Sequence, residues 1–216
     1  MKDEMNLIYT IQRNNVFCSN YNDLSDINSA FSIHWTVYMI RNMFRQNKTF
    51  YVLVFPPWGV FDVGGQRSQR KKWVHCFDDA KAIIYVASLN EYDQVLLEDD
   101  KTNRMQESLQ LFRHVVNSRY FVRTAVILFL NKKDLFEKKI GHGKSLRIAF
   151  PHYKGRENYD EAAKYIETQF LAANENRDKS IYTHLTCATD TKQVQFVLDS
   201  VLDTISSAKL RGSGLY

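Results

Sequence analysis

The sequence predicts an α/β fold in which a mostly parallel sheet is flanked by helices. Near-continuous apolar runs at residues 81–87 and 125–130 have the length of strands, and such runs are typical of strands buried on both faces. Apolar residues at helical spacing lie between the two runs and after them. Repeated strand-then-helix units favour a parallel sheet, because each helix carries the chain back across one face.

Upstream of this unit, residues 49–55 could form a strand. The turn formers Pro56-Pro57-Trp58-Gly59 separate it from a second apolar strand, which ends near Asp62. Residues 81–87 form the next strand, and a helix is predicted over 104–117. The apolar positions of that helix are Met105, Leu109, Phe112 and Val116.

The C-terminal part continues the alternation. After the strand at 125–130, a helix is predicted from about Tyr159, with acidic residues favouring its start. A strand at 181–186 follows. The last helix begins near residue 190, and its apolar stripe, which ends at Ile205, must be buried.

The first 60 residues differ in character. Residues 5–12 could form a strand, whereas residues 14–28 are rich in Asn, Asp and Ser and are typical of a loop or a weak helix. We therefore divide the chain into a divergent segment of unclear fold, residues 1–60, and an α/β domain, residues 61–216.

Composition excludes several classes of protein. With 216 residues, of which 44% are hydrophobic, the chain can bury a core and is expected to form one main domain. The net charge of +5 favours anionic partners, but no nucleic-acid module is recognisable, so no nucleic-acid partner is expected.

The three cysteines lack metal-type spacing and predict reduced thiols. No apolar run has the length of a membrane span and the N-terminus is acidic, which predicts a cytoplasmic location.

Two groups of residues suit nucleotide chemistry. In Asp62-Val63-Gly64-Gly65-Gln66, the Asp suits magnesium, the Gly65 backbone can close on a terminal phosphate and the Gln can orient water. In Asn131-Lys132-Lys133-Asp134, the Asn can hold a purine edge, the Lys stem can lie along a flat ring, and Asp134 can accept from two N–H groups of guanine. The alternatives are a Gly-Gly turn for the first group and a solvated turn for the second.

Two further segments carry weaker signals. Thr186-Cys187-Ala188-Thr189 follows the last strand, where small residues let backbone N–H groups approach a base oxygen, although small residues are common at strand ends. Residues 67–77 are basic and aromatic, which suits partner binding. The alternative for that segment is a surface helix with Trp73 and Phe77 folded into the core.

These motifs, in this order, resemble those of heterotrimeric G-protein alpha subunits, and the inhibitory-type subfamily is the most similar. The resemblance runs from Phe61 to Tyr216. It implies a Ras-like P-loop GTPase fold and a role in coupling G-protein-coupled receptors to effectors through GTP binding and hydrolysis. The segments that carry it are Asp62–Ser68, Lys71–Phe77, Asn131–Phe136 and Thr186–Thr191.

The resemblance implies GTP or GDP and Mg²⁺ as cofactors. Asp62 would lie near the metal, Gly65 would lie at the gamma-phosphate, and Gln66 would be the catalytic residue that orients the attacking water. Guanine would be read by Asn131, Lys132, Asp134 and Ala188. The remaining cofactor-binding positions would be Val63, Gly64, Cys187 and Thr189.

The resemblance also implies a beta-gamma dimer and a receptor as partners, which could recruit the chain to the inner face of the plasma membrane. Arg70 would pair with Glu107 in the GTP-bound form. The beta subunit would contact Lys72, Trp73, Cys76 and Phe77. The C-terminal tail would enter a receptor with Leu210, Gly214, Leu215 and Tyr216. Ser213 stands where inhibitory subtypes have cysteine, so modification by pertussis toxin is not expected, and Gly at position 2, needed for fatty acylation, is absent.

The half of the site that holds the phosphates lacks its expected residues. A phosphate loop needs two glycines with four residues between them and then Lys and Ser, but all eight glycines lie at or after Gly59. Gly143-Lys144-Ser145 has the right ending without the earlier glycine. The family's arginine and threonine before the second strand are also absent. Loss of about five charge-assisted hydrogen bonds predicts ~10⁵-fold weaker nucleotide binding and severely impaired hydrolysis.

The missing segment leaves two alternatives to a GTP-dependent switch. The chain could be a nucleotide-independent decoy for the beta-gamma dimer or the receptor, or a truncated product without function. It also raises a question of folding, because the strand before the phosphate loop is central in the family's sheet. Residues 5–12 or 49–55 would have to replace that strand to keep the last helix covered.

Overall fold

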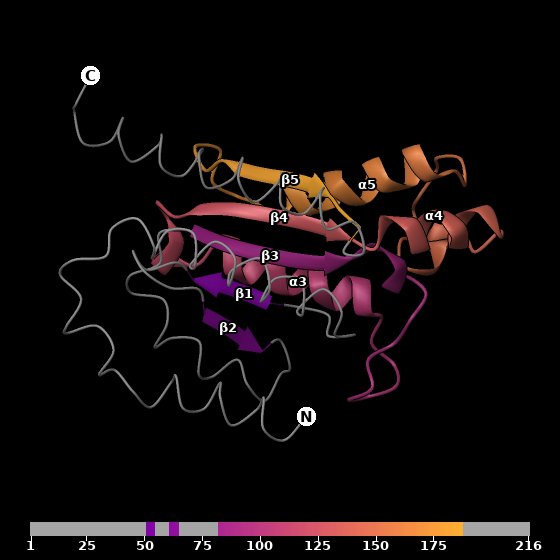
Figure 1. The fold of residues 1–216 in the computed structure, drawn as a ribbon, viewed down its shortest axis with the longest axis horizontal. Coiled ribbons are helices and arrows are strands. Elements are labelled where there is room, and N and C mark those ends of the chain that lie inside the picture. The colour runs from indigo at the N-terminus through magenta and orange to yellow at the C-terminus, as the bar shows by residue number, and fades with distance from the viewer. Residues whose placement is uncertain (1–50, 55–60, 65–81, 188–216) are drawn as a thin grey trace, which may run out of the picture. The chain divides into compact units, whose positions relative to one another are not determined.

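The computed structural model describes residues 51–54, 61–64 and 82–187, all of which belong to one compact unit, Thr36–Tyr216. It confirms the α/β fold. Figure 1 shows the strands side by side in one five-stranded sheet, in the order β2-β1-β3-β4-β5. The predicted helix at 190–205, the segment 67–77 with its alternative as a surface helix, and the possible strand at 5–12 lie outside the described residues.

Three adjacent strands form the parallel part of the sheet. They are β3 (Ala82–Ser88), β4 (Ala125–Asn131) and β5 (Ile181–Leu185). Every residue of β3 is buried, as are the last six of β4, which is what continuous apolar runs predict for strands covered on both faces. The three strands predicted from sequence are therefore confirmed, each within one residue of its expected start.

The other two strands form an antiparallel hairpin at the side of β3. The strand β1 (Tyr51–Val54) pairs antiparallel with both β2 (Phe61–Gly64) and β3. Of the two segments considered as a replacement for the central strand, residues 49–55 thus supply a strand that lies directly beside β3. It runs opposite to β3, so its carboxyl end points to the amino ends of the parallel strands.

Two long helices pack against one another and share the main core with the parallel strands. They are α3 (Arg104–Val116) and α5 (Tyr159–Ala172), both confirmed from sequence. Each has an Asn N-cap: Asn103 accepts from the backbone N–H of Met105 and Gln106, and Asn158 from that of Glu161.

An aromatic cluster joins these helices to the sheet. The ring of Phe112 on α3 lies 4.8 Å from that of Tyr85 on β3 and 5.4 Å from that of Phe170 on α5, between ring centroids. All three side chains are fully buried. The Tyr85 hydroxyl donates to the backbone oxygen of Ser108 at 2.6 Å, so its polar end is satisfied inside the core.

A third helix, α4 (Lys133–Gly141), was not predicted. Its start coincides with the Asn131–Asp134 motif, for which a solvated turn was the alternative, but Phe136 and Ile140 are four residues apart and both are buried, which is the pattern of a short amphipathic helix. Asp134 in its first turn and Lys138 and Lys139 in its last turn suit the helix dipole. The shorter 3₁₀ turns are η2 (Leu89–Glu91), η3 (Arg119–Phe121) and η4 (Leu146–Ile148).

The opposite face of the sheet is buried too. Ile84 on β3 and Ile127 and Phe129 on β4 are fully buried, although they are not part of the core shared with α3 and α5. Within the described ranges, no helix is both long enough and apolar enough to cross a membrane.

The aromatic cluster predicts a large loss of stability on truncation. Phe112→Ala should lower the free energy of unfolding by about 3–5 kcal/mol, because it leaves a cavity between β3 and the two helices. Urea denaturation measures the loss. The matched control is Leu97→Ala, whose side chain is 84% exposed and should change stability by less than about 0.5 kcal/mol. Equal effects of the two variants would contradict this assignment of the core.

His184 predicts a pH dependence of stability. Its ring on β5 lies 5.8 Å from that of Phe129, between centroids, and burial lowers the pKa of His184 below its ordinary 6.5. The unfolded chain therefore takes up a proton more readily than the folded one, so stability should fall as the pH drops through about 6.5. His184→Gln should lose less stability than the parent between pH 7.5 and about 5.5 in urea denaturation. An equal loss in both proteins would exclude His184 as the cause.

Candidate functional site

Two of the predicted motifs meet at the carboxyl ends of β4 and β5. The backbone N–H of Thr186, just after β5, donates to Leu130 O at 2.9 Å, and the N–H of Lys133 donates to Thr186 O at 3.2 Å. The Thr186 hydroxyl, which is fully buried, donates to Asn131 Oδ1 at 3.3 Å. Asn131, which is expected to read guanine, is therefore joined to the first residue of the Thr186–Thr189 motif at this edge of the sheet, where α/β folds bind ligands.

The polar groups that remain at this edge suit a purine. Asn131 is 2% exposed, and its Nδ2 group donates to no described residue. The half-buried carboxylate of Asp134, in the first turn of α4, likewise accepts from no described residue. An amide donor and a carboxylate acceptor are thus available for a ring nitrogen and for the two N–H groups of guanine.

Lys132 lies between these two residues in a constrained conformation. Its backbone is left-handed, with φ 60° and ψ 38°, and it occupies the N-cap position of α4. For a residue other than glycine this conformation costs free energy. It therefore persists only where the surrounding structure fixes it, as often happens at functional sites. The Lys132 ammonium lies 3.2 Å from Glu91 Oε1.

Glu91 also lies at this edge of the sheet and was not predicted from the sequence. It ends η2, directly after β3, and its side chain is 2% exposed. Arg104 Nη1 at the start of α3 lies 3.5 Å from Glu91 Oε2, so one buried carboxylate faces two cations. The signal in the sequence was an acidic residue three positions after the carboxyl end of an apolar strand, at the same edge as Asn131.

The hairpin places the Asp62 motif at this edge as well. Because β2 is antiparallel to β1, and β1 is antiparallel to β3, β2 points in the same direction as the parallel strands. Asp62, Val63 and Gly64 form the carboxyl end of β2, opposite Leu53, Val52 and Tyr51 of β1. The magnesium role of Asp62 remains a prediction: among the described residues, no group of three or more His, Cys, Asp or Glu could hold a metal ion.

The remaining predicted site residues divide into two sets. Glu107 lies in the first turn of α3 and is 8% exposed, and Cys187 follows Thr186 and is half-buried. The others lie outside the described residues, and their roles stay predictions. These are Gly65, Gln66, Arg70, Lys72, Trp73, Cys76, Phe77, Ala188, Thr189, Leu210, Gly214, Leu215 and Tyr216.

The segment Gly143-Lys144-Ser145 is occupied by structural contacts. The Ser145 hydroxyl donates to Glu157 Oε1 at 2.6 Å, and the backbone N–H of Leu146 donates to Glu157 Oε2 at 3.0 Å. Ser145 also caps η4 by accepting from the N–H of Arg147. A carboxylate therefore takes donors that a phosphate would need.

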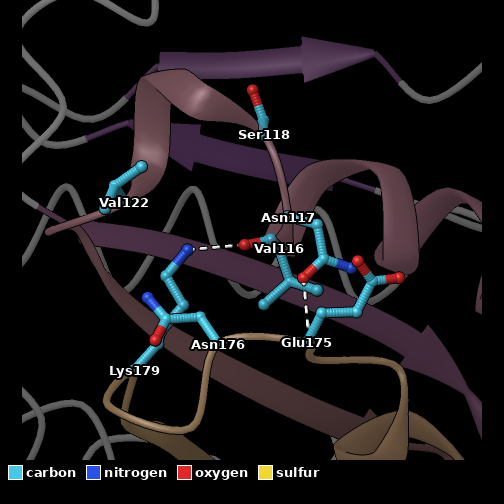
Figure 2. A pocket seen from close by; sticks show the side chains of 7 residues that line it. All are labelled: Val116, Asn117, Ser118, Val122, Glu175, Asn176 and Lys179. Carbon is cyan, nitrogen blue, oxygen red and sulfur yellow. Dashed lines mark hydrogen bonds between the residues drawn. The ribbon is translucent and has the colours of Figure 1, made fainter.

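A pocket of about 250 Å³ lies at the opposite edge of the sheet, between the end of α3 and the loop before β5 (Figure 2). The ammonium of Lys179 donates to Val116 O at 2.6 Å, and burial lowers the pKa of Lys179. Asn117 links the same two segments, donating to Ala173 O and accepting from the N–H of Glu175. Both side chains tie down the carboxyl end of α3, so we assign this pocket a structural role.

Comparison with known proteins agrees with the geometry. The family model of the G-protein alpha subunit matches residues 37–205, which is well over half of the chain. The resemblance of the motifs begins at Phe61, but the match to the family model begins upstream of that residue. The match therefore includes β1.

Individual relatives are similar over the same region. The chain is 69% identical over 159 residues to the guanine nucleotide-binding protein alpha-1 subunit of Caenorhabditis briggsae and 65% identical to that of Caenorhabditis elegans, in each case over 73% of this chain and 44% of the relative. It is 59% identical over 157 residues to the guanine nucleotide-binding protein G(o) subunit alpha of Locusta migratoria, with the same coverage. The chain thus spans less than half the length of these curated relatives.

The junction of the two motifs predicts a coupled effect on stability. Asn131→Ala should lower the free energy of unfolding by about 1–3 kcal/mol, because it leaves the buried Thr186 hydroxyl without its acceptor. Adding Thr186→Val removes that unpaired hydroxyl, so the double variant should lose less than the sum of the two single losses. Urea denaturation of the four proteins measures the coupling, and strictly additive losses would show that the contact contributes nothing.

Proposed function

Because the chain belongs to the G-protein alpha-subunit family, we propose that it acts in guanine-nucleotide-dependent signalling and recognises the guanine base at the carboxyl ends of β4 and β5. The observation that carries the proposal is the pairing of Asn131 with Thr186, which brings both base-reading motifs together. Asn131 Nδ2 would donate to the purine edge, and Asp134 would accept from the two N–H groups of guanine. Adenine offers no such pair of donors.

Binding of the phosphates is proposed to be weak. The 216 residues contain no phosphate loop, and β1 runs antiparallel to β3, so β1 itself ends at the edge away from Asn131. The phosphates would be held by Asp62 through Mg²⁺ and by the backbone of Gly64 and Gly65. With most of the usual charge-assisted hydrogen bonds missing, affinity for GTP and GDP should be ~10⁵-fold below that of a complete site, and hydrolysis through Gln66 should be severely impaired.

The proposed partners are a beta-gamma dimer and a receptor. The basic and aromatic segment 67–77 would bind the beta subunit, and the C-terminal tail would bind the receptor. Contact with these partners would recruit the chain to the plasma membrane. A second candidate function follows from the lack of phosphate-loop glycines in the sequence: a module that binds the same partners without nucleotide.

The base site predicts a change of specificity. Titration of the purified chain with a fluorescent GDP analogue, with GDP, ADP and XDP as competitors, should give weak binding in the order GDP before ADP. Asp134→Asn should bind GDP more weakly and XDP more strongly than the parent does, because an amide can donate to the 2-oxygen of xanthine. Glu137→Gln, an exposed carboxylate on the same helix, is the matched control and should bind like the parent. Equal competition by GDP and ADP would reject guanine recognition.

Pull-down with a purified beta-gamma dimer separates the two candidate functions. A guanine-dependent switch should bind the dimer more strongly with GDP than without nucleotide. Retention that is indifferent to GDP, together with no binding of the fluorescent analogue, would favour the nucleotide-independent module.

A further inference from the structure

A buried carboxylate, Glu91, lies between helix α3 and the segment Asn131–Asp134, which we call the guanine loop. Its side chain is 2% exposed, and it closes η2 immediately after β3. A carboxylate in such a position is costly unless cations face it. Two do: Lys132 Nζ is 3.2 Å from Oε1 and Arg104 Nη1 is 3.5 Å from Oε2.

The contact to Lys132 is the closer of the two. Lys132 Nζ donates to Glu91 Oε1, and its own side chain is only 14% exposed. Lys132 carries its charge at the end of a flexible four-carbon stem. With the ammonium fixed at Glu91, the hydrocarbon stem of Lys132 is the part left to meet a flat base.

The contact to Arg104 keeps Glu91 in place from the other side. The Arg104 guanidinium also donates to Val95 O at 3.0 Å and to Gln94 Oε1 at 3.5 Å, so it is anchored to the loop before α3. Glu91 Oε2 has no hydrogen-bond donor among the described residues, and only the charge of Arg104 compensates it. Each of the two cations therefore faces only one oxygen of the Glu91 carboxylate.

We propose that Glu91 is a positioning residue of the guanine site: it holds the Lys132 ammonium away from the base and ties the guanine loop, through Arg104, to the first turn of α3. The proposal deepens the proposed function and rests on it. It gives Glu91 no contact with nucleotide. Binding of the base would then also depend on the position of α3, whose first turn carries Glu107.

The pairing itself can be tested without nucleotide. The full-length chain is treated with an amine-acylating reagent, and the acylation rates of Lys132 and its neighbour Lys133 are read by peptide mass spectrometry. In Glu91→Gln, Lys132 should react about tenfold faster than in the parent, which corresponds to the loss of one charge-assisted hydrogen bond of ~1.4 kcal/mol. Lys133, which Glu91 does not contact, should react at an unchanged rate and serves as the internal control.

The positioning role is tested by a double-mutant cycle read with a fluorescent GDP analogue. Glu91→Gln should weaken binding about five- to tenfold when Lys132 is present. In the Lys132→Met background, which keeps an apolar stem but has no ammonium, the same change should have almost no effect. A purely structural role for Glu91 would weaken binding equally in both backgrounds. Glu91→Asp, which keeps the carboxylate, should lie between Glu91→Gln and the parent in both assays.

The outcomes separate this proposal from the proposed function. Failure of the parent chain to bind the GDP analogue rejects guanine recognition, while the acylation rates still decide whether Glu91 holds Lys132. Unchanged acylation of Lys132 in a folded Glu91→Gln protein overturns the proposal, as does an equal loss of GDP binding in both backgrounds. If Glu91→Gln does not fold, Glu91→Asp is judged by the same two criteria.

Discussion

The register of β4 between β3 and β5 determines which side chains meet at the site. Ser88 pairs with Asn131, and Leu130 pairs with Leu185, so the three strands end together. As a result η2, the guanine loop and Thr186 leave the sheet at one edge. A shift by one residue would turn every side chain of β4 to the other face of the sheet. The aromatic cluster of Tyr85, Phe112 and Phe170 packs one face of β3 against the two helices.

This register also determines which polar and apolar groups are left at the edge of the sheet to meet a base in the proposed site. Thr186 uses the oxygen of the Asn131 amide, which leaves the nitrogen as a donor, and Glu91 uses the ammonium of Lys132, which leaves the stem. Asp134 lies in the first turn of α4, where an acidic residue suits the helix dipole. In the proposed site, contacts outside the base thus leave Asn131 as a donor and the Lys132 stem as an apolar surface, beside Asp134 as an acceptor.

Most of the fold could be predicted from the sequence because long apolar runs and helical periodicity depend on burial, which is strong in β3, β4, α3 and α5. Helix α4 was missed because its apolar pair, Phe136 and Ile140, is short and its start coincides with the polar guanine motif. The direction of β1 could not be predicted, since four apolar residues pair equally well with a neighbour in either direction. Asn131 and Asp134 of the candidate site could be proposed from their place after a strand. Glu91 could not, because its contacts are with Lys132 and Arg104, which are distant in sequence.

The central claim is that the guanine base binds at the edge formed by Asn131, Asp134 and Thr186, independently of strong phosphate contacts. NMR titration with GMP and AMP tests it most directly, since a monophosphate depends little on the missing loop. The account predicts that GMP shifts the backbone amide resonances of residues 131–134 and 185–187, and that AMP at the same concentration leaves them in place. Shifts confined to other parts of the chain, or equal shifts with both nucleotides, would contradict it.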